Sequence, residues 1–210
     1  DPIPEAGEGD AAQGQFAFMA MEYYRFTQDI AFLQEIYPEL IHALAYLQGL
    51  RAGAEDLLPA TGTPPEHSNP AHRYSDHYWA LLGWKEGLNA ASILARTNDA
   101  TWAKEQYQAL RSAVRQSLRE QMDRMDDSWI PASAEEDRFD AVSVARMYWP
   151  CEETDLVEPH EFQSSLDCFY EECLGRRQAG GIPSDESLLL VPLAGMGRGD
   201  AGRVSTLYDV

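Results

Sequence analysis

Lysine, cysteine and long apolar runs are scarce in this 210-residue sequence. Only two lysines occur, Lys85 and Lys104, and the 35 acidic residues outnumber the 16 basic ones, for a formal net charge of −19. Nucleic acid or an anionic membrane would require clustered basic side chains, so we expect neither as a partner. No apolar run approaches the ~20 residues that span a bilayer, and we expect a soluble protein.

Cysteine spacing and glycine patterns argue against the common cofactor sites. Cys151, Cys168 and Cys173 form no CxxC pair and have no histidine at metal-ligand spacing, so we expect free thiols and no metal. The sequence also lacks the GxxxxGK[ST] and GxGxxG loops that cradle phosphates. We therefore expect no cofactor.

Apolar residues are present in the proportion of a packed protein, 44%, and their spacing is helical. They recur every three or four residues, and no segment alternates with the period of two that strands require. The sequence predicts an all-α fold. Strong helices are expected at 13–29, 33–47, 81–95 and 103–125, and weaker ones at 140–148, 160–174 and 187–196.

Two segments of the chain repeat each other at an offset of 70 residues. Each has a Thr, then an Asp, then an aromatic residue three positions later, then Glu and Tyr. We interpret each Asp as the N-cap of the following helix and each aromatic residue as a plug between the two helices of a hairpin. The matched residues are Thr27 and Thr97, Asp29 and Asp99, Phe32 and Trp102, Glu35 and Glu105, and Tyr37 and Tyr107, with a fainter third cap at Asp200.

Repeated hairpins predict a toroid, or part of one, in a single domain over 1–210. Hairpins are expected at 10–51, 75–125, 137–175 and 183–210, about three and a half in all. The loops 52–75, 126–139 and 151–159 all precede the first helix of a pair, so we expect them to gather at one mouth. Because an incomplete ring leaves apolar flanks bare, we expect either a homodimer or the remainder of a longer chain to cover them. A first residue other than Met agrees with an excised segment.

One stretch resembles a known group of enzymes. The sequences Asp56-Leu-Leu-Pro-Ala60 and Arg73-Tyr-Ser-Asp76-His-Tyr-Trp79, the Asn98-Asp99 joint and the Ala20–Asp29 helix end are similar to the six-hairpin glycosidases. These are the (α/α)6-barrel enzymes that include glucoamylase-like and debranching-type glucosidases. The likeness covers about residues 8 to 125. It implies an inner helical ring around a sugar-binding funnel, a carbohydrate substrate and an inverting pair of carboxyl groups.

Inverting hydrolysis requires a protonated carboxyl group and a carboxylate that activates water, about 6.5–9.5 Å apart. Asp76 is the first candidate, since its aromatic neighbours could desolvate it and raise its pKa; alternatively, Asp76 or Ser75 caps the third helix. Asp10, after a glycine-flanked Glu8, is the second candidate, with an N-cap as its alternative. Glu186 is the third.

Aromatic and hydrogen-bonding side chains near these carboxyl groups are candidates for sugar binding. Trp84 lies in an apolar stripe and is expected in the core, whereas Trp129 and Trp149 could face the funnel or pack against helices. The predicted substrate-binding residues are Tyr74, His77, Trp79, Glu8, Trp149 and Arg73. The alternative functions are a non-catalytic helical module that binds a glycan or a protein, and a prenyl-transfer or terpene enzyme on a related toroid.

Overall fold

The computed structural model describes residues 11–51, 53, 56–62, 70–125 and 128–178, and within them the fold is all-α, as predicted. The described part of the chain contains no strand, only isolated β-bridges between loops. The fourth predicted hairpin, 183–210, with its helix 187–196 and Asp200, lies outside the described residues. The elements are α1 (Ala12–Thr27), α2 (Ile30–Leu50), α3 (Tyr74–Ile93), α4 (Thr97–Met125), α5 (Ala141–Tyr148), a 3₁₀ turn η1 (Thr154–Leu156) and α6 (Pro159–Gln178).

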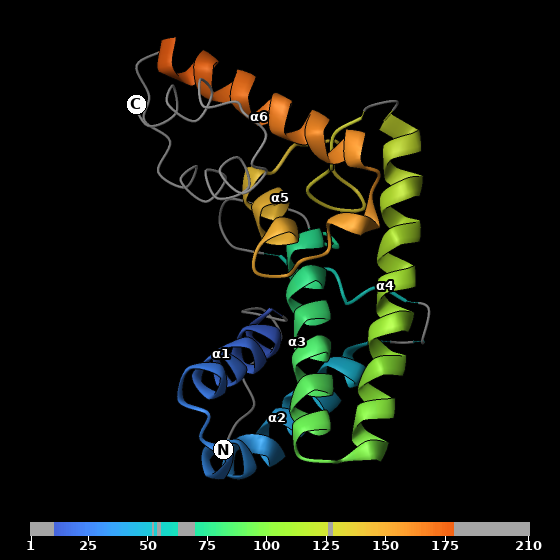
Figure 1. Ribbon diagram of the computed structural model, residues 1–210. Helices are drawn as coiled ribbons and strands as arrows, with labels where there is room; N and C mark the ends of the chain where they lie inside the picture. The colour runs from blue at the N-terminus through green and yellow to red at the C-terminus, as the bar shows by residue number, and fades with distance from the viewer. Residues whose placement is uncertain (1–10, 52, 54–55, 63–69, 126–127, 179–210) are drawn as a thin grey trace.

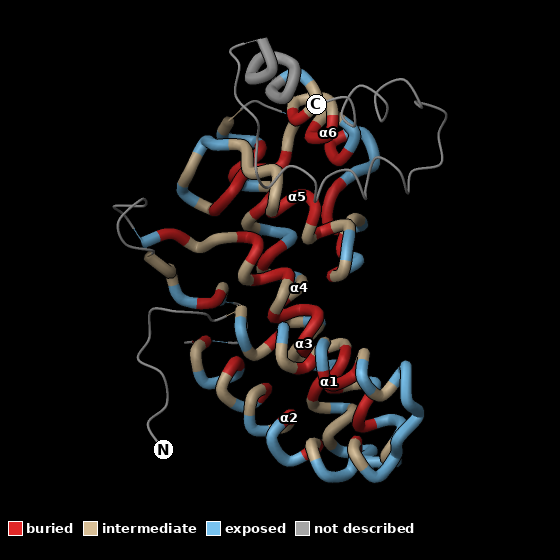
Figure 2. The backbone as a smooth tube through the Cα atoms, turned by 90° about the vertical axis from the view of Figure 1, so that its left-hand side faces the viewer, coloured by how far each residue is buried: buried red, intermediate tan, exposed pale blue. Residues whose placement is uncertain are grey.

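Helix α3 is the centre of the fold. It packs against α4, α1 and α5, and 13 of its 20 residues are buried. Figure 1 shows α3 and α4 as an antiparallel pair beside the α1–α2 hairpin, with α6 lying across the far end. Figure 2 shows buried residues along α3 between more exposed outer segments. Because water is excluded around α3, any polar side chain on it requires a partner.

The joint between α1 and α2 agrees with the sequence prediction. Gln28 takes a positive φ of 54°, and the Asp29 carboxylate accepts hydrogen bonds from the backbone N–H groups of Ala31 and Phe32 at 3.0 Å each. The Phe32 ring packs on Tyr23 of α1, with 4.3 Å between centroids. Asp29 is therefore an N-cap, and the following aromatic residue closes the joint.

The second joint departs from the first at its aspartate. Helix α4 begins at Thr97, two residues before Asp99, so the prediction that Asp99 is an N-cap is wrong. Its carboxylate instead accepts a hydrogen bond of 2.7 Å from the Tyr37 hydroxyl on α2, a tertiary contact that links the two hairpins. The aromatic plug is confirmed, since Trp102 packs on the fully buried Trp84 with 5.1 Å between centroids.

Helices α1 and α3 approach each other closely at two glycines. A Cβ atom on Gly14 would overlap the backbone carbonyl of Trp79, and one on Gly83 would lie 3.0 Å from the Gly14 Cα atom. Since the obstruction at Gly14 is backbone, it cannot move without shifting a helix.

We therefore expect Gly14→Ala to lower the free energy of unfolding by about 1–3 kcal/mol, the usual cost of overpacking. Gly49, in α2, is the matched control, because a Cβ atom on it would meet no other atom within 4 Å. Gly49→Ala should raise stability by about 0.5–1 kcal/mol through helix propensity. Urea unfolding followed by circular dichroism measures both free energies of unfolding. Equal effects of the two substitutions would contradict the close approach of α1 and α3 at Gly14.

Candidate functional site

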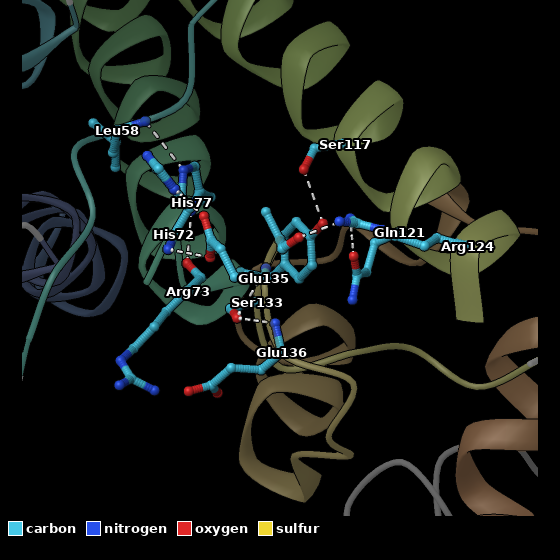
Figure 3. Close-up of polar contacts among 12 residues, drawn as sticks. Leu58, His72, Arg73, His77, Ser117, Gln121, Arg124, Ser133, Glu135 and Glu136 are labelled. Atoms are coloured by element: carbon cyan, nitrogen blue, oxygen red, sulfur yellow. Dashed lines mark hydrogen bonds and ion pairs between the residues drawn. The ribbon is translucent and has the colours of Figure 1, made fainter. Parts of the chain in front are cut away.

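Two of the three long loops meet at the beginning of α3. The backbone of Arg73 forms an antiparallel bridge with Ser133, and the Tyr74 N–H donates to the carbonyl of Ala132 at 3.1 Å. The His72 N–H donates to the Glu135 carboxylate at 2.9 Å, and the imidazole of His72 contacts the same carboxylate. Figure 3 shows this junction. Two of the three loops expected to gather thus meet here, at 70–73 and 128–140. The third, 151–159, instead contacts the middle of α3 at Lys85 and α4 at Arg111.

Two predicted substrate-binding residues, Tyr74 and His77, are buried at this junction. The Tyr74 hydroxyl lies 2.9 Å from the Ser117 hydroxyl on α4, and burial raises the pKa of Tyr74 to about 12. The His77 Nδ1–H donates to the Arg73 carbonyl at 2.6 Å, while Nε2 accepts from the Leu58 N–H at 3.1 Å. Figure 3 shows His77 between these partners. Both side chains attach neighbouring segments to α3.

Asp76 occupies the first turn of α3. Because α3 begins at Tyr74 with Arg73 as its N-cap residue, the alternative that Asp76 or Ser75 caps this helix is wrong. A side-chain cap is dispensable there, since the Tyr74 N–H already has a backbone acceptor in the neighbouring loop. The partly exposed Asp76 carboxylate accepts a 2.9 Å hydrogen bond from the Thr61 hydroxyl. The other predicted carboxyl residues, Glu8, Asp10 and Glu186, lie outside the described residues.

The structure brings Trp79 and Trp149 together through Phe18 of α1. The Phe18 ring lies 6.1 Å from Trp79 and 6.4 Å from Trp149 between centroids, edge-on to the latter. Trp149 is 55% exposed, so much of this residue meets solvent. Trp129 instead packs edge-on against Phe139 of the same loop, with 6.2 Å between centroids.

Two of the predicted binding residues carry buried N–H groups that lack a hydrogen-bond acceptor among the described residues. They are the indole Nε1 of Trp79 and one terminal nitrogen, Nη2, of Arg73. A buried donor left unpaired costs about 1–3 kcal/mol. The indole Nε1 of the core residue Trp84 is in the same situation, so an unpaired donor does not by itself mark a binding site.

A pocket of about 330 Å³ opens beside this aromatic group, between α1, α3 and the segment that follows α5. We call it the aromatic–carboxylate pocket, because its walls combine two aromatic rings with three carboxylates. It is lined by Phe18, Glu22, Arg25, Leu82, Lys85, Glu86, Asn89, Trp149, Pro150 and Glu152.

Glu86 is the most buried ionisable group of the aromatic–carboxylate pocket. Its side chain is 5% exposed, and its carboxylate accepts hydrogen bonds from Arg25 at 2.5 Å and from Asn89 at 3.2 Å. Arg25 also pairs with Glu22 at 2.7 Å. The guanidinium therefore fixes two carboxylates, one from α1 and one from α3, at the same wall.

A second buried carboxylate, Glu153, positions the other wall. It is 0% exposed and lies 3.0 Å from the Lys85 Nζ, 3.0 Å from the Arg111 Nε and 2.9 Å from the Tyr107 hydroxyl. Lys85 also donates to the Cys151 carbonyl. These contacts attach segment 149–153 to α3 and α4, and so hold Trp149 and Glu152 at the pocket. Burial raises the pKa of the Cys151 thiol to about 12, which keeps it protonated.

Two larger hollows differ from the aromatic–carboxylate pocket in the residues that line them. One of about 690 Å³ is lined by residues such as His72 and Ser117 and has no exposed aromatic face other than the imidazole. Another of about 750 Å³ holds the stacked Tyr148 and Phe162, and its carboxylates Asp155 and Glu158 pair with arginines of α4. Neither of these two hollows is lined by an indole ring.

Sequence reasoning missed Glu22 and Glu86, which lie within helices, because it searched the loop-to-helix junctions. Glu152 was among the carboxyl residues at those junctions but was not selected as a site residue. One signal was available: Glu86 lies four positions from both Leu82 and Ala90, so it shares a helix face with residues that are buried. A charged side chain on such a face requires a tertiary partner or a ligand.

Comparison with protein-family models, with curated proteins and with solved structures gives no match to this chain. Among the described residues, no three His, Cys, Asp or Glu side chains are arranged to hold a metal ion. None of the described helices is both long enough and apolar enough to cross a bilayer.

Proposed function

We propose that the chain is part of a glycoside hydrolase of helical-hairpin architecture, and that a saccharide binds in the aromatic–carboxylate pocket. The observation that carries the proposal is the exposed Trp149, which lines one pocket together with Glu86, Asn89 and Arg25. Flat aromatic faces cover the apolar faces of sugar rings, and paired carboxylate, amide and guanidinium groups bind hydroxyls. The repeated hairpins and the meeting of two entry loops at α3 support a toroidal arrangement.

The distances along α3 limit which carboxyl groups can act together. Asp76 and Glu86 are ten residues apart, a rise of about 15 Å along the helix. That exceeds the roughly 6.5–9.5 Å of an inverting pair, so the two would serve different parts of a substrate. We propose that Glu86 holds a hydroxyl or water inside the pocket. Asp76 does not line the pocket, so we propose it as a proton donor whose water-activating partner is a carboxylate other than Glu86.

The alternative is a non-catalytic module that binds a glycan. One observation favours it: Glu86 already accepts hydrogen bonds from Arg25 and Asn89, and it lies too far along α3 to act as a pair with Asp76. Binding and cleavage must therefore be tested separately.

Binding is tested by replacing the exposed indole. We expect Trp149→Ala to weaken saccharide affinity about tenfold or more, since truncating an aromatic anchor costs above about 1 kcal/mol. The matched control is Trp129→Ala, which removes a partly exposed indole that packs on Phe139 and does not line the pocket. Titration calorimetry against a panel of mono- and disaccharides measures both. The parent chain, Trp149→Ala and Trp129→Ala would bind with equal affinity if the saccharide did not contact Trp149. That result, or no binding by the parent chain, would contradict the proposed saccharide site.

Cleavage is tested with aryl glycosides on the parent chain, on Asp76→Asn and on Glu86→Gln. Loss of turnover in a variant that still binds the saccharide supports hydrolysis. A parent chain that binds saccharides but turns over none of the panel supports the non-catalytic module.

A further inference from the structure

The charges around the aromatic–carboxylate pocket do not balance. Arg25 is shared between Glu22 and Glu86, so one positive charge faces two negative ones. Among the described residues, Glu152 has no ion-pair partner, and it is exposed at the mouth beside Trp149. Three carboxylates therefore line a pocket in which one guanidinium is available to them.

Lys85 lines the same pocket but does not offset this excess. Its Nζ is 3.0 Å from the fully buried Glu153 and also donates to the Cys151 carbonyl, so its charge is directed into the protein behind the pocket wall. Glu153 and Asp155 in turn engage Arg111. The pocket keeps an excess of two negative charges, in a protein whose net charge is −19.

An aromatic face adds to the attraction for a cation. The quadrupole of an indole ring attracts an ammonium group placed over the ring, by roughly 0.5–1 kcal/mol at exposed sites. Trp149 is 55% exposed and lines the pocket together with Glu152, so its indole is accessible to a ligand there. A carboxylated ligand would meet the opposite situation, because it would have to displace Glu22 or Glu86 from Arg25.

We propose that the ligand of this pocket is a sugar that carries a protonated amine, an amino sugar rather than a neutral or a uronic one. This inference rests on the proposed saccharide site. The ring would lie on Trp149 while its ammonium group lies between Glu152 and the Glu22–Glu86 pair. The expected preference is modest, since charges near a surface interact through an effective dielectric much higher than that of the dry interior.

The test compares four methyl glycosides that share one ring: the glucosaminide, its N-acetyl derivative, the glucoside and the glucuronide. With the full chain at low ionic strength, we expect the glucosaminide to bind about tenfold more tightly than the glucoside. N-acetylation should abolish that advantage, because it removes the charge, and the glucuronide should bind most weakly. The advantage should shrink at higher salt through screening.

Two variants and one further probe make each outcome decisive. Glu152→Gln should reduce the preference for the glucosaminide severalfold, whereas Glu105→Gln, which removes the same charge from an exposed position on α4 outside the pocket, should leave it unchanged. Equal binding of glucosaminide and glucoside overturns the charge preference while the saccharide site stands. Binding of n-butylammonium as tightly as the glucosaminide overturns the sugar and leaves a cation site. No binding of any glycoside overturns both.

Discussion

Replacing Glu153 with Ala is expected to lower the free energy of unfolding by about 3–5 kcal/mol, the cost of removing one partner from a buried charge network. Glu153 is fully buried, and its loss leaves Lys85 and Arg111, whose side chains are 25% and 20% exposed, without their shared carboxylate. The Tyr107 hydroxyl loses its acceptor as well. Urea unfolding measured by circular dichroism gives the change.

Two further variants separate the network from a general effect of losing a carboxylate. Glu158→Ala removes an exposed glutamate paired with Arg119, and should change stability by no more than about 1 kcal/mol. Tyr107→Phe removes one hydrogen bond and should cost about 1 kcal/mol. If Glu153→Ala were no more damaging than Glu158→Ala, the buried network would not hold segment 149–153 in place.

Acidification from pH 6.5 to pH 4 is expected to remove up to about 3 kcal/mol of stability through His77 alone. Burial lowers the pKa of His77 to about 4, because the folded protein desolvates the imidazolium, and this outweighs the hydrogen bond to the Arg73 carbonyl. The unfolded chain has an ordinary imidazole that titrates near pH ~6.5. Between these two pH values the unfolded state binds a proton that the folded state does not. The contribution of His77 to the free energy of unfolding is therefore fully present above about pH 6.5 and is lost as the pH is lowered.

The contribution of His77 is isolated by comparing pH slopes. His77→Gln should flatten the dependence of unfolding free energy on pH between 6.5 and 4, whereas His42→Gln, at an exposed position on α2, should leave the slope of the parent chain unchanged. NMR titration of the imidazole carbons provides a second measurement, and His77 should remain neutral down to about pH 4. An imidazole that titrates at its ordinary pKa in the folded chain would contradict the burial.

Local features of the fold were predictable from the sequence. Apolar spacing predicted the helices now seen as α1, α2, α4 and α5, and their ends agree within a few residues. The exception is α4, which begins at Thr97 rather than at the predicted residue 103. Asp29 was predicted as an N-cap, and Phe32 and Trp102 as plugs between paired helices. These features depend on hydrogen bonds and contacts within one hairpin, which neighbouring residues determine.

The positions of Asp99 and Asp76 depended on more distant contacts. The repeat predicted a cap at Asp99, but the second joint places it within the helix, where Tyr37, 62 residues earlier, donates to it. At the start of α3, where a side-chain cap was the expected alternative, the Tyr74 N–H donates to the Ala132 carbonyl in the next loop. Tyr37 and Ala132 are both more than 50 residues from their partners in the sequence, so the spacing of neighbouring residues could not predict these contacts.

What the sequence by itself determined about this protein is its helical class, its acidic charge and the chemistry of its first hairpin joint, since these follow from composition and from residues three or four apart. Only the tertiary structure decided which carboxylates share a pocket. Arg25 reaches Glu86 across 61 residues, and Lys85 lies next to the Cys151 carbonyl across 66. Such contacts form because packing α1 and segment 149–153 against α3 removes water from part of each charged side chain, which must then find a partner wherever the chain has placed one.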